Sequence, residues 1–307
     1  MDKQFDLVIV GGGTAGMTAA IYGARAGKKV LVLEQLICGG QIVNAAEVEN
    51  YPGIRSVSGA DFASALFEQA SSVGAEFDFR QVTGLQEAED GFLVLTADGP
   101  IKAGAVILAT GAKNRPLELP GEEALTGRGV SYCAACDGAF YRDKTAAVVG
   151  GGNTALEDAL VLSGLCRQVY LIHRRDTFRG EQKTLELVEA RPNITVLRSS
   201  VVMRLLGDGR LCGAIVKDLK TGEEKTLPLD GLFVAIGQMP QNKPFADLVR
   251  LNEEGYIQAG ENCRTSHPGI FTAGDCRSKK VRQLSTAAGD GAVAAMTALE
   301  YLRMMGR

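Results

Sequence analysis

One segment of the chain occurs twice, and this repeat restricts the fold more than any other feature. Residues 7–16 read LVIVGGGTAG, and residues 146–155 read AAVVGGGNTA. Each copy is a short apolar run, then three glycines, then a stretch with helical spacing, and a second apolar run follows at 30–33 and at 169–172. Strand, helix and parallel strand make a βαβ unit. The chain therefore predicts an α/β fold with two Rossmann-like dinucleotide-binding domains.

The segments after each βαβ unit also correspond. Residues 74–108 contain short alternating runs with turn signals, and a buried run there leads into Thr110 and Gly111. A similar run ends the second half at 232–237. Two polar stretches containing proline, 112–116 and 238–244, predict the domain boundaries. The apolar residues of 284–302 have helical spacing, and we expect this helix to pack on the first domain. That domain is then discontinuous, with residues 1–114 and 244–307, and the second domain is 115–243.

Composition excludes several classes of protein. The 307 residues suggest about two domains. Lys and Arg number 33 against 36 Asp and Glu, so a general nucleic-acid binder is not indicated. No apolar run approaches the length of a membrane span of about 18 residues, and residues 1–6 carry two acids where a signal peptide carries positive charge. Seven cysteines, an odd number, do not suggest a disulfide framework. We expect a cytoplasmic protein.

The first glycine cluster has the spacing of a dinucleotide fingerprint. Gly11, Gly13 and Gly16 lie between the strand and the helix, and Glu34 ends the second strand 21 residues after Gly13. Glycines let the backbone approach a pyrophosphate at the helix N-terminus, and the carboxylate can accept hydrogen bonds from ribose hydroxyls. The alternative is a glycine turn beside a solvated glutamate.

The second cluster differs at the position that meets the ribose. Gly150 and Gly152 keep the spacing, but no acid ends the following strand. The residues there are His173, Arg174, Arg175 and Arg179. Arginines hold a 2′-phosphate through charge-assisted bonds, whereas an acid would repel it, so this copy predicts NADP(H). A solvated basic strand end is the alternative, and a metal role for His173 is disfavoured because no ligand cluster surrounds it.

A third motif is the pair Cys133 and Cys136, directly followed by Asp137. The spacing is typical of a small, readily reduced disulfide, and Asp137 could exchange protons with it. Half of a zinc site and a pair of inert thiols remain alternatives, although no second closely spaced pair exists in the sequence. Together with two dinucleotide sites, the motif favours a redox-active dithiol.

These motifs resemble the bacterial thioredoxin reductases of low molecular weight, which are NADPH- and FAD-dependent pyridine nucleotide-disulfide oxidoreductases. The resemblance covers nearly the whole chain. The matching segments are 39–41, 47–53, 131–138, 150–155, 173–176 with Arg179, Gly274 with Asp275, and Arg282 with Gln283. Departures from the usual pattern are residues 277–281, which replace an acid-containing loop and an aromatic residue, Leu284 in place of a small residue, and Gly180 in place of alanine.

The resemblance implies two domains of the three-layer ββα type, with FAD in the first and NADPH in the second. It implies flavin contacts at Gly11, Gly13, Gly16, Glu34, Gly40, Gln41, Asn50, Thr110, Gly111, Asp275, Arg282 and Gln283. It implies NADPH contacts at Gly150, Gly152, Asn153, Thr154, His173, Arg174, Arg175 and Arg179. Cys136 would react with the flavin and Cys133 with the partner disulfide, while Asp137 manages the proton.

The expected activity is transfer of electrons from NADPH through FAD and the Cys133–Cys136 disulfide to thioredoxin or a thioredoxin-like protein. Family resemblance also implies a homodimer, and rotation of the NADPH domain about the stretches 112–116 and 238–244 between half-reactions. An alternative partner is another small disulfide carrier, glutaredoxin-like or peroxiredoxin-linked. A redox sensor without turnover is an alternative of another class. Relatives that accept electrons from ferredoxin have lost the arginines that this chain keeps.

Overall fold

The computed structural model of the protein describes residues 4–45 and 47–307, so Met1 to Lys3, part of the N-terminal segment considered above, lie outside the described residues. Contacts divide the chain into two units. One contains the residues up to 113 together with 239–307, and the other is 114–238. The divisions fall inside the two stretches that contain proline, one and five residues before the boundaries expected from the sequence.

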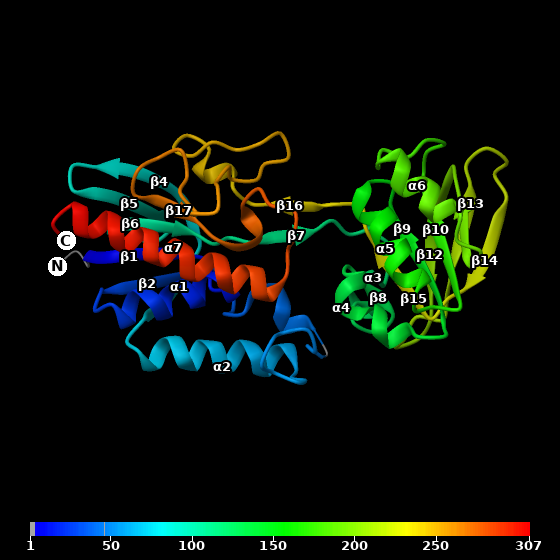
Figure 1. Ribbon diagram of the computed structural model, residues 1–307, viewed down its shortest axis with the longest axis horizontal. Helices are drawn as coiled ribbons and strands as arrows, with labels where there is room; N and C mark the ends of the chain where they lie inside the picture. Colours follow the sequence, from blue (N-terminus) through cyan, green and yellow to red (C-terminus); the bar gives the residue numbers. More distant parts are fainter. Residues whose placement is uncertain (1–3, 46) are drawn as a thin grey trace. The chain divides into compact units, whose positions relative to one another are not determined.

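The first unit is built on a sheet of the order β3-β2-β1-β6-β5-β4, with β17 paired to β6 (Figure 1). β1 runs parallel to β2 and β6, whereas β5 is antiparallel to β6 and β4. The strands are β1 (Gln4–Val10), β2 (Val30–Glu34), β3 (Glu76–Phe79), β4 (Val82–Ala88), β5 (Gly91–Thr96), β6 (Ile101–Leu108) and β17 (Ile270–Thr272). The central strands β1, β2 and β6 are mostly apolar because both faces of the sheet are covered.

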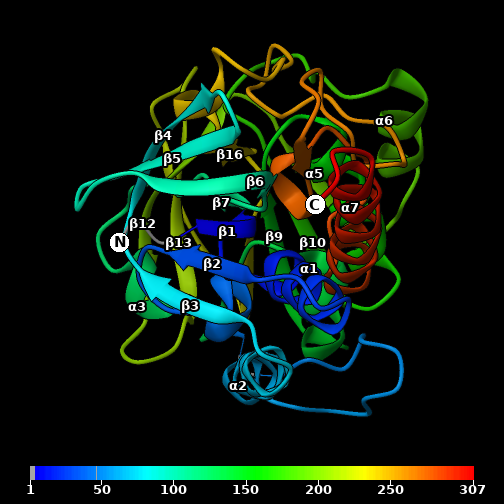
Figure 2. The ribbon, with the colours of Figure 1, turned by 90° about the vertical axis from the view of Figure 1, so that its left-hand side faces the viewer.

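Side chains of β1 alternate between two cores. Leu7 and Ile9 belong to the core under the helices, while Val8 and Val10 belong to the core under β4 and β5. The helices are α1 (Thr14–Arg25), α2 (Gly59–Ser72) and α7 (Leu284–Met304). A Cβ at Gly291 of α7 would lie 2.2 Å from the carbonyl oxygen of Ala15, so α1 and α7 cross in backbone contact (Figure 2). The C-terminal helix therefore packs on the first unit, as the sequence predicted.

The second unit repeats these layers. Its parallel sheet has the order β11-β10-β9-β15-β8, and an antiparallel sheet of the order β12-β13-β14 covers one face. The strands are β8 (Val130–Ser131), β9 (Thr145–Val149), β10 (Gln168–Ile172), β11 (Ile194–Leu197), β12 (Ser200–Leu206), β13 (Gly213–Asp218), β14 (Glu224–Pro228) and β15 (Gly231–Val234). The helices are α3 (Glu122–Leu125), α4 (Ala134–Asp137), α5 (Asn153–Ser163) and α6 (Gln182–Glu189). Both units thus have the expected ββα layering.

The remaining elements are short. The two connections between the units pair with each other as β7 (Ala112–Asn114) and β16 (Gln238–Pro240). Four 3₁₀ turns complete the description: η1 (Gly40–Asn44), η2 (Gly138–Tyr141), η3 (Lys243–Phe245) and η4 (Gly274–Cys276). Both predicted βαβ units are confirmed, since α1 lies between parallel β1 and β2, and α5 lies between parallel β9 and β10.

Candidate functional site

Cys133 and Cys136 form a disulfide, with Cα atoms 5.3 Å apart. Cys133 precedes α4, and the backbone N–H of Cys136 donates to its Sγ at 3.1 Å. Ala134, between them, is buried in the core that α5 also lines, which anchors this turn. Cys136 is exposed, and Cys133 is half-buried. The pair is therefore held on a fixed turn with one sulfur open to solvent.

Asp137 is coupled to this turn through a residue to which the sequence assigned no role. The hydroxyl of Ser131 donates to Oδ2 of Asp137 at 2.6 Å. Burial raises the pKa of the Asp137 carboxyl above its usual range, and the hydrogen bond from Ser131 opposes that shift. A half-buried carboxyl beside a disulfide can hold a proton at a higher pH than an exposed one. A serine before the cysteine pair gave no separate signal in the sequence.

The other cysteines differ from this pair in reactivity. Burial raises the pKa of Cys38, Cys166 and Cys263 to about 11. Burial also raises the pKa of Cys276, whereas Cys212 is exposed. The four buried side chains remain thiols at neutral pH and are poor nucleophiles. Among the residues that the structure describes, no group of His, Cys, Asp and Glu could hold a metal ion.

The glycines of the first unit serve two purposes. A Cβ at Gly11 would lie 2.2 Å from the carbonyl oxygen of Ala109, and one at Gly16 would lie 1.9 Å from that of Gly11. These two positions need glycine for packing. At Gly13 the nearest atom would be 3.9 Å away, and within the described chain no side chain caps α1, which begins there. The space in front of this helix N-terminus is therefore available to an anion.

Glu34 lies at the end of β2 beside this loop. Its Oε2 accepts the N–H of Gly12 at 2.8 Å, and its Oε1 accepts that of Gln35 at 2.7 Å. A carboxylate has further acceptor positions, so Glu34 can also bind hydroxyls. A cavity of about 390 Å³ opens here, and its lining includes Gly11, Glu34, Thr110, Arg80, Lys243 and Phe245. The last three were missed by the sequence, since they come from distant segments without a motif.

The other expected flavin-contact residues are held by contacts within the first unit. A Cβ at Gly40 would lie 3.5 Å from the Cα of Gly13. Asn50 donates to the side chain of Gln283 at 3.3 Å, although the two are far apart in the chain. Further contacts of the expected residues are from Gln41 to the carbonyl of Ala112, from Thr110 to buried Asn242, and from Arg282 to the carbonyl of Asp275. Gly111 has a positive φ of 66° with open space at its Cβ position.

Asp275 supplies a test of whether a polyol such as the ribityl chain of FAD fits. Its Oδ1 is buried, and no hydrogen-bond partner for it exists among the described residues. Burial raises the pKa of this carboxyl, while Lys279 and Arg282 counteract the rise. A buried acceptor without a partner is unfavourable, and a ligand hydroxyl would satisfy it. The residues of this unit thus fit a bound dinucleotide with a hydroxylated chain.

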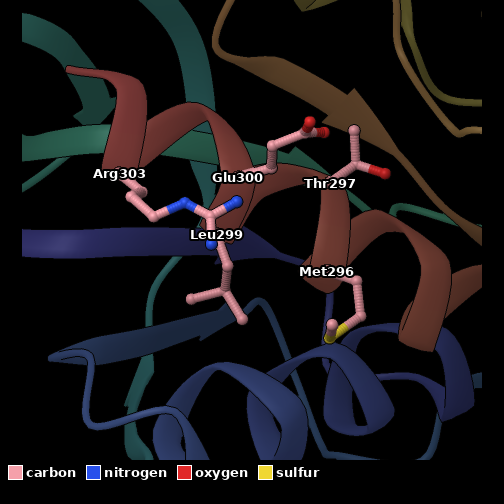
Figure 3. A pocket seen from close by; sticks show the side chains of 5 residues that line it. All are labelled: Met296, Thr297, Leu299, Glu300 and Arg303. Atoms are coloured by element: carbon pink, nitrogen blue, oxygen red, sulfur yellow. The ribbon is translucent and has the colours of Figure 1, made fainter.

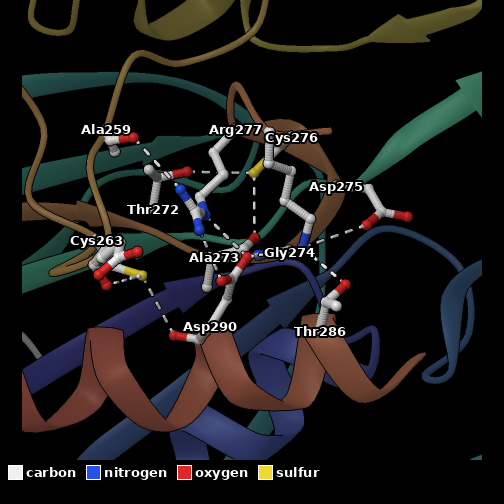
Figure 4. Close-up of polar contacts among 12 residues, drawn as sticks. Ala259, Cys263, Thr272, Ala273, Gly274, Asp275, Cys276, Arg277, Thr286 and Asp290 are labelled. Carbon is white, nitrogen blue, oxygen red and sulfur yellow. Dashed lines mark hydrogen bonds and ion pairs between the residues drawn. The ribbon is translucent and has the colours of Figure 1, made fainter. Parts of the chain in front are cut away.

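A charge network lies directly beside Asp275 (Figure 4). Arg277 donates to both carboxyl oxygens of Asp290 on α7, each at 2.9 Å. Lys279, only 8% exposed, donates to Asp290 at 2.9 Å and to Thr286 at 3.1 Å. Its Nζ also lies 3.9 Å from Oδ1 of Asp275. Two basic residues that depart from the family pattern therefore join η4 to α7, an arrangement that the sequence did not indicate.

The glycine loop of the second unit repeats the pattern of the first. A Cβ at Gly150 would lie 2.3 Å from the carbonyl oxygen of Ala235, whereas nothing lies within 4 Å at Gly152. Asn153 at the start of α5 accepts the backbone N–H of Glu181 at 2.7 Å. Thr154 is exposed in the first turn of the helix. A ligand phosphate can approach this helix N-terminus as well.

The basic segment after β10 folds back onto this loop. The backbone N–H of Arg179 donates to the carbonyl of Gly151 at 2.8 Å. The side chains of Arg174, Arg175 and Arg179 are exposed and make no ion pair within the described chain. A Cβ at Gly180 would lie 2.5 Å from Cδ1 of buried Leu156, which explains how glycine at this position lets the segment close on α5.

His173 is placed differently from the arginines. It is only 5% exposed, and its ring packs against Gly151 and stacks on Phe178 with centroids 4.7 Å apart. Its Nε2 lies 3.1 Å from the carbonyl oxygen of Thr177. Burial lowers its pKa, so it remains neutral at neutral pH. His173 thus supports the loop that carries the arginines.

Residues 5–291 match the family described as pyridine nucleotide-disulphide oxidoreductase, and the chain belongs to this family. It is 41% identical to a thioredoxin reductase of Listeria monocytogenes, and the match covers 98% of this chain and 95% of the relative. It is 39% identical to a thioredoxin reductase of Bacillus subtilis, and that match covers 98% of this chain and 96% of the relative. A crystal structure of thioredoxin reductase from Streptococcus pyogenes matches with a TM-score of 0.94 at 39% identity, covering 99% of this chain and all of that one. Within the described chain, no helix has the length and apolar character of a membrane span.

Proposed function

We propose that the protein is an NADPH-dependent thioredoxin-disulfide reductase. Electrons pass from NADPH through FAD and the Cys133–Cys136 disulfide to the disulfide of thioredoxin or a thioredoxin-like protein. The observation that carries the proposal is the disulfide itself. It is followed directly by Asp137, whose pKa burial raises, and its unit also contains a nucleotide loop bordered by arginines. Relatives named thioredoxin reductase across nearly the whole chain support it.

FAD would be held in the first unit. Gly13 leaves room for the pyrophosphate, Glu34 accepts ribose hydroxyls, and the unpartnered oxygen of Asp275 accepts a hydroxyl of the ribityl chain. Asn50 and Gln283, which bind each other, lie among the other expected contacts. When bound, FAD supplies hydride and electron transfer between a nicotinamide and a disulfide.

NADPH would be held in the second unit. Gly152 leaves the N-terminus of α5 open for the pyrophosphate. Arg174, Arg175 and Arg179 offer guanidinium groups to the 2′-phosphate. His173 keeps their loop in place from its interior side.

The dithiol would act in three steps. Two electrons break the S–S bond and leave one thiolate and one thiol, the proton of the thiol coming from Asp137. Cys133 then attacks the partner disulfide to form a mixed disulfide, and Cys136 attacks the sulfur of Cys133 to release the reduced partner. The N–H of Cys136, 3.1 Å from the Cys133 sulfur, stabilises negative charge on Cys133. This supports assigning Cys133 to the partner and Cys136 to the flavin.

The nicotinamide site and the disulfide belong to the same unit, and both must reach one flavin. We therefore propose that this unit rotates about its two connections between half-reactions. The chain divisions fall at these connections, which supports hinges there.

The protein is also proposed to be a homodimer in the cytoplasm, the compartment that supplies NADPH and thioredoxin. On α7, a shallow pocket of about 350 Å³ is lined by Met296, Thr297, Leu299, Glu300 and Arg303 (Figure 3). Met296 is 58% exposed, and apolar side chains on a surface are typical of contacts between subunits. Light scattering of the wild type and of Met296→Glu tests this: the wild type should have twice the monomer mass, and a monomeric wild type would contradict it.

The activity is tested by following NADPH oxidation with a thioredoxin and a disulfide dye, with thioredoxin omitted in the control. Oxidation should require thioredoxin. Cys136→Ser should retain flavin reduction by NADPH and lose thioredoxin reduction. If NADPH bleached the flavin but thioredoxin had no effect, the reductase chemistry would be kept, and the partner would be another disulfide carrier. Absence of bleaching would overturn the nicotinamide assignment.

A further inference from the structure

Ser131 lies two residues before the disulfide and contacts both Cys133 and the acid that follows the disulfide. It ends β8, is only 4% exposed, and pairs with Phe233 of β15. Its hydroxyl donates to Oδ2 of Asp137 at 2.6 Å and accepts the backbone N–H of Cys133 at 3.1 Å. We propose that Ser131 is a positioning residue. Its hydroxyl ties the Asp137 carboxyl to the Cys133 backbone and forms a hydrogen bond with this carboxyl both when it is ionised and when it is protonated. The inference rests on the proposed function.

The geometry accommodates both states of the carboxyl. A serine hydroxyl has one hydrogen and two acceptor positions. When Asp137 is ionised, the hydrogen points to its Oδ2. When Asp137 is protonated, the carboxyl becomes the donor, and the serine hydrogen can turn to the carbonyl oxygen of Cys133, 3.5 Å away. Only rotation about the Cβ–Oγ bond is needed, and the hydrogen bond from the Cys133 N–H is kept throughout.

Such a device is useful because Asp137 must both give and take a proton. Burial alone favours the neutral carboxyl, and the bond from Ser131 restores access to the ionised form. Asp137 gives its proton to one sulfur when two electrons break the disulfide. It regains a proton when a cysteine thiol ionises for exchange with the partner. Without Ser131 the first of these transfers becomes less favourable, because the carboxylate left after proton loss has no hydrogen bond from this hydroxyl.

No other side chain in the described part of the protein donates a hydrogen bond to this carboxyl. The neighbouring titratable or charged groups are Tyr141, the groups Cys166, Arg210 and Asp230 that act on Tyr141, and Glu157 and Asp158 of α5, which packs on α4. Of these, Tyr141 interacts with Asp137 electrostatically: burial raises the pKa of Tyr141, and the Asp137 charge raises it further. The pH response of Asp137 is therefore expected to depend on Ser131 more than on any neighbouring charge.

The test uses a probe that requires neither NADPH nor thioredoxin. The rate at which dithiothreitol reduces the Cys133–Cys136 disulfide in the purified holoprotein is measured from about pH 5.5 to about pH 9. The thiols formed are alkylated and counted by mass spectrometry. The variants are Ser131→Ala, Ser131→Gly and Ser131→Thr, each also in an Asp137→Asn background. Ser131→Ala and Ser131→Gly both remove the hydroxyl, so the test remains valid if one of these two variants does not fold. The control is Ser163→Ala, which removes a hydroxyl of α5 bonded to the carbonyl of Leu160.

Rates are expressed relative to the Asp137→Asn protein, so that ionisation of dithiothreitol cancels and the midpoint due to Asp137 remains. Loss of the hydroxyl should move the pH midpoint attributed to Asp137 upward by about one unit, the size expected for one hydrogen bond to a charged group. Ser131→Thr should keep the wild-type midpoint, and Ser131→Ala should have no further effect in the Asp137→Asn background. An unchanged midpoint, or an effect that persists in that background, would overturn the inference. Failure of the proposed function would be seen separately, as wild-type protein that does not oxidise NADPH in the presence of thioredoxin.

Discussion

The ammonium group of Lys279 lies 3.9 Å from Oδ1 of Asp275, the buried carboxyl oxygen that has no hydrogen-bond partner among the described residues. Asp290 holds Lys279 in this position at 2.9 Å. The lysine is too far away to satisfy the oxygen, but its charge favours the ionised carboxylate. Asp275 is thereby kept as an acceptor for a ligand.

Lys279→Met should therefore weaken FAD binding. We expect the dissociation constant of FAD for the apoprotein to rise about tenfold, equivalent to about 1.4 kcal/mol. Flavin fluorescence in a titration of apoprotein measures it without enzyme turnover. The matched control is Lys280→Met, because Lys280 is exposed one residue further on. Equal affinities for the two variants would show that the Lys279 charge does not act on the flavin site.

Gly150 and Gly152 should respond differently to alanine. A Cβ at Gly152 meets nothing within 4 Å, and the residue has an ordinary φ of −98°, so Gly152→Ala should fold. The added methyl group occupies space needed by the pyrophosphate, and KM for NADPH should rise about tenfold or more. In Gly150→Ala the Cβ would lie 2.3 Å from a backbone oxygen, so its Tm should fall. Tm and KM for both variants check this, and a normal KM in Gly152→Ala would contradict the site.

The arginines after β10 should discriminate between the two nicotinamide cofactors. In Arg174→Ala with Arg175→Ala, KM for NADPH should rise about 10- to 100-fold, because charge-assisted bonds to the 2′-phosphate are lost. KM for NADH, which lacks this phosphate, should change little. Arg167→Ala, before the opposite end of β10, is the control. Steady-state kinetics with both cofactors give the answer, and an equal loss for both would remove the basis for assigning NADPH.

Asp158 on α5 should make stability depend on pH. Burial, and secondarily the charge of Glu157, raises its pKa to about 7. Because the folded-state value is raised, the neutral carboxyl contributes stability below its ordinary pKa, and this contribution is lost as pH rises through about 7. Asp158→Asn should match wild type near pH 4 and become progressively more stable than wild type up to about pH 7. Urea midpoints measure the difference; a constant gap at all pH values would contradict it.

The two βαβ units and their glycine loops could be predicted from sequence because their signals are local. A strand covered on both faces reads as an apolar run, and the next helix follows a glycine turn within a few residues. Gly11 and Gly13 illustrate what local signals cannot predict. Both belong to the fingerprint, but only the structure shows that Gly11 is required by packing against Ala109, while Gly13 leaves space for a ligand.

His173, in the basic segment, is a second residue whose structural role the local sequence could not predict. Its position beside three arginines predicted a ligand contact, and a one-dimensional pattern cannot tell which side chains of a loop point inward. The structure turns the imidazole ring onto Gly151 and leaves the arginines exposed. The roles of these four residues in NADPH binding stay predictions.

The sequence by itself determined the number of nucleotide loops and the identity of the disulfide pair, since each depends on residues close together in the chain. The cofactor preference of the second loop stays a prediction from the same local pattern. Tertiary structure decided how distant residues combine. Asn50 meets Gln283, and Thr110 meets Asn242, although 233 and 132 positions separate the members of these two pairs in the chain. Hydrogen bonds and charge interactions act over a few ångströms in space, whatever the separation along the chain, and only the fold supplies that proximity.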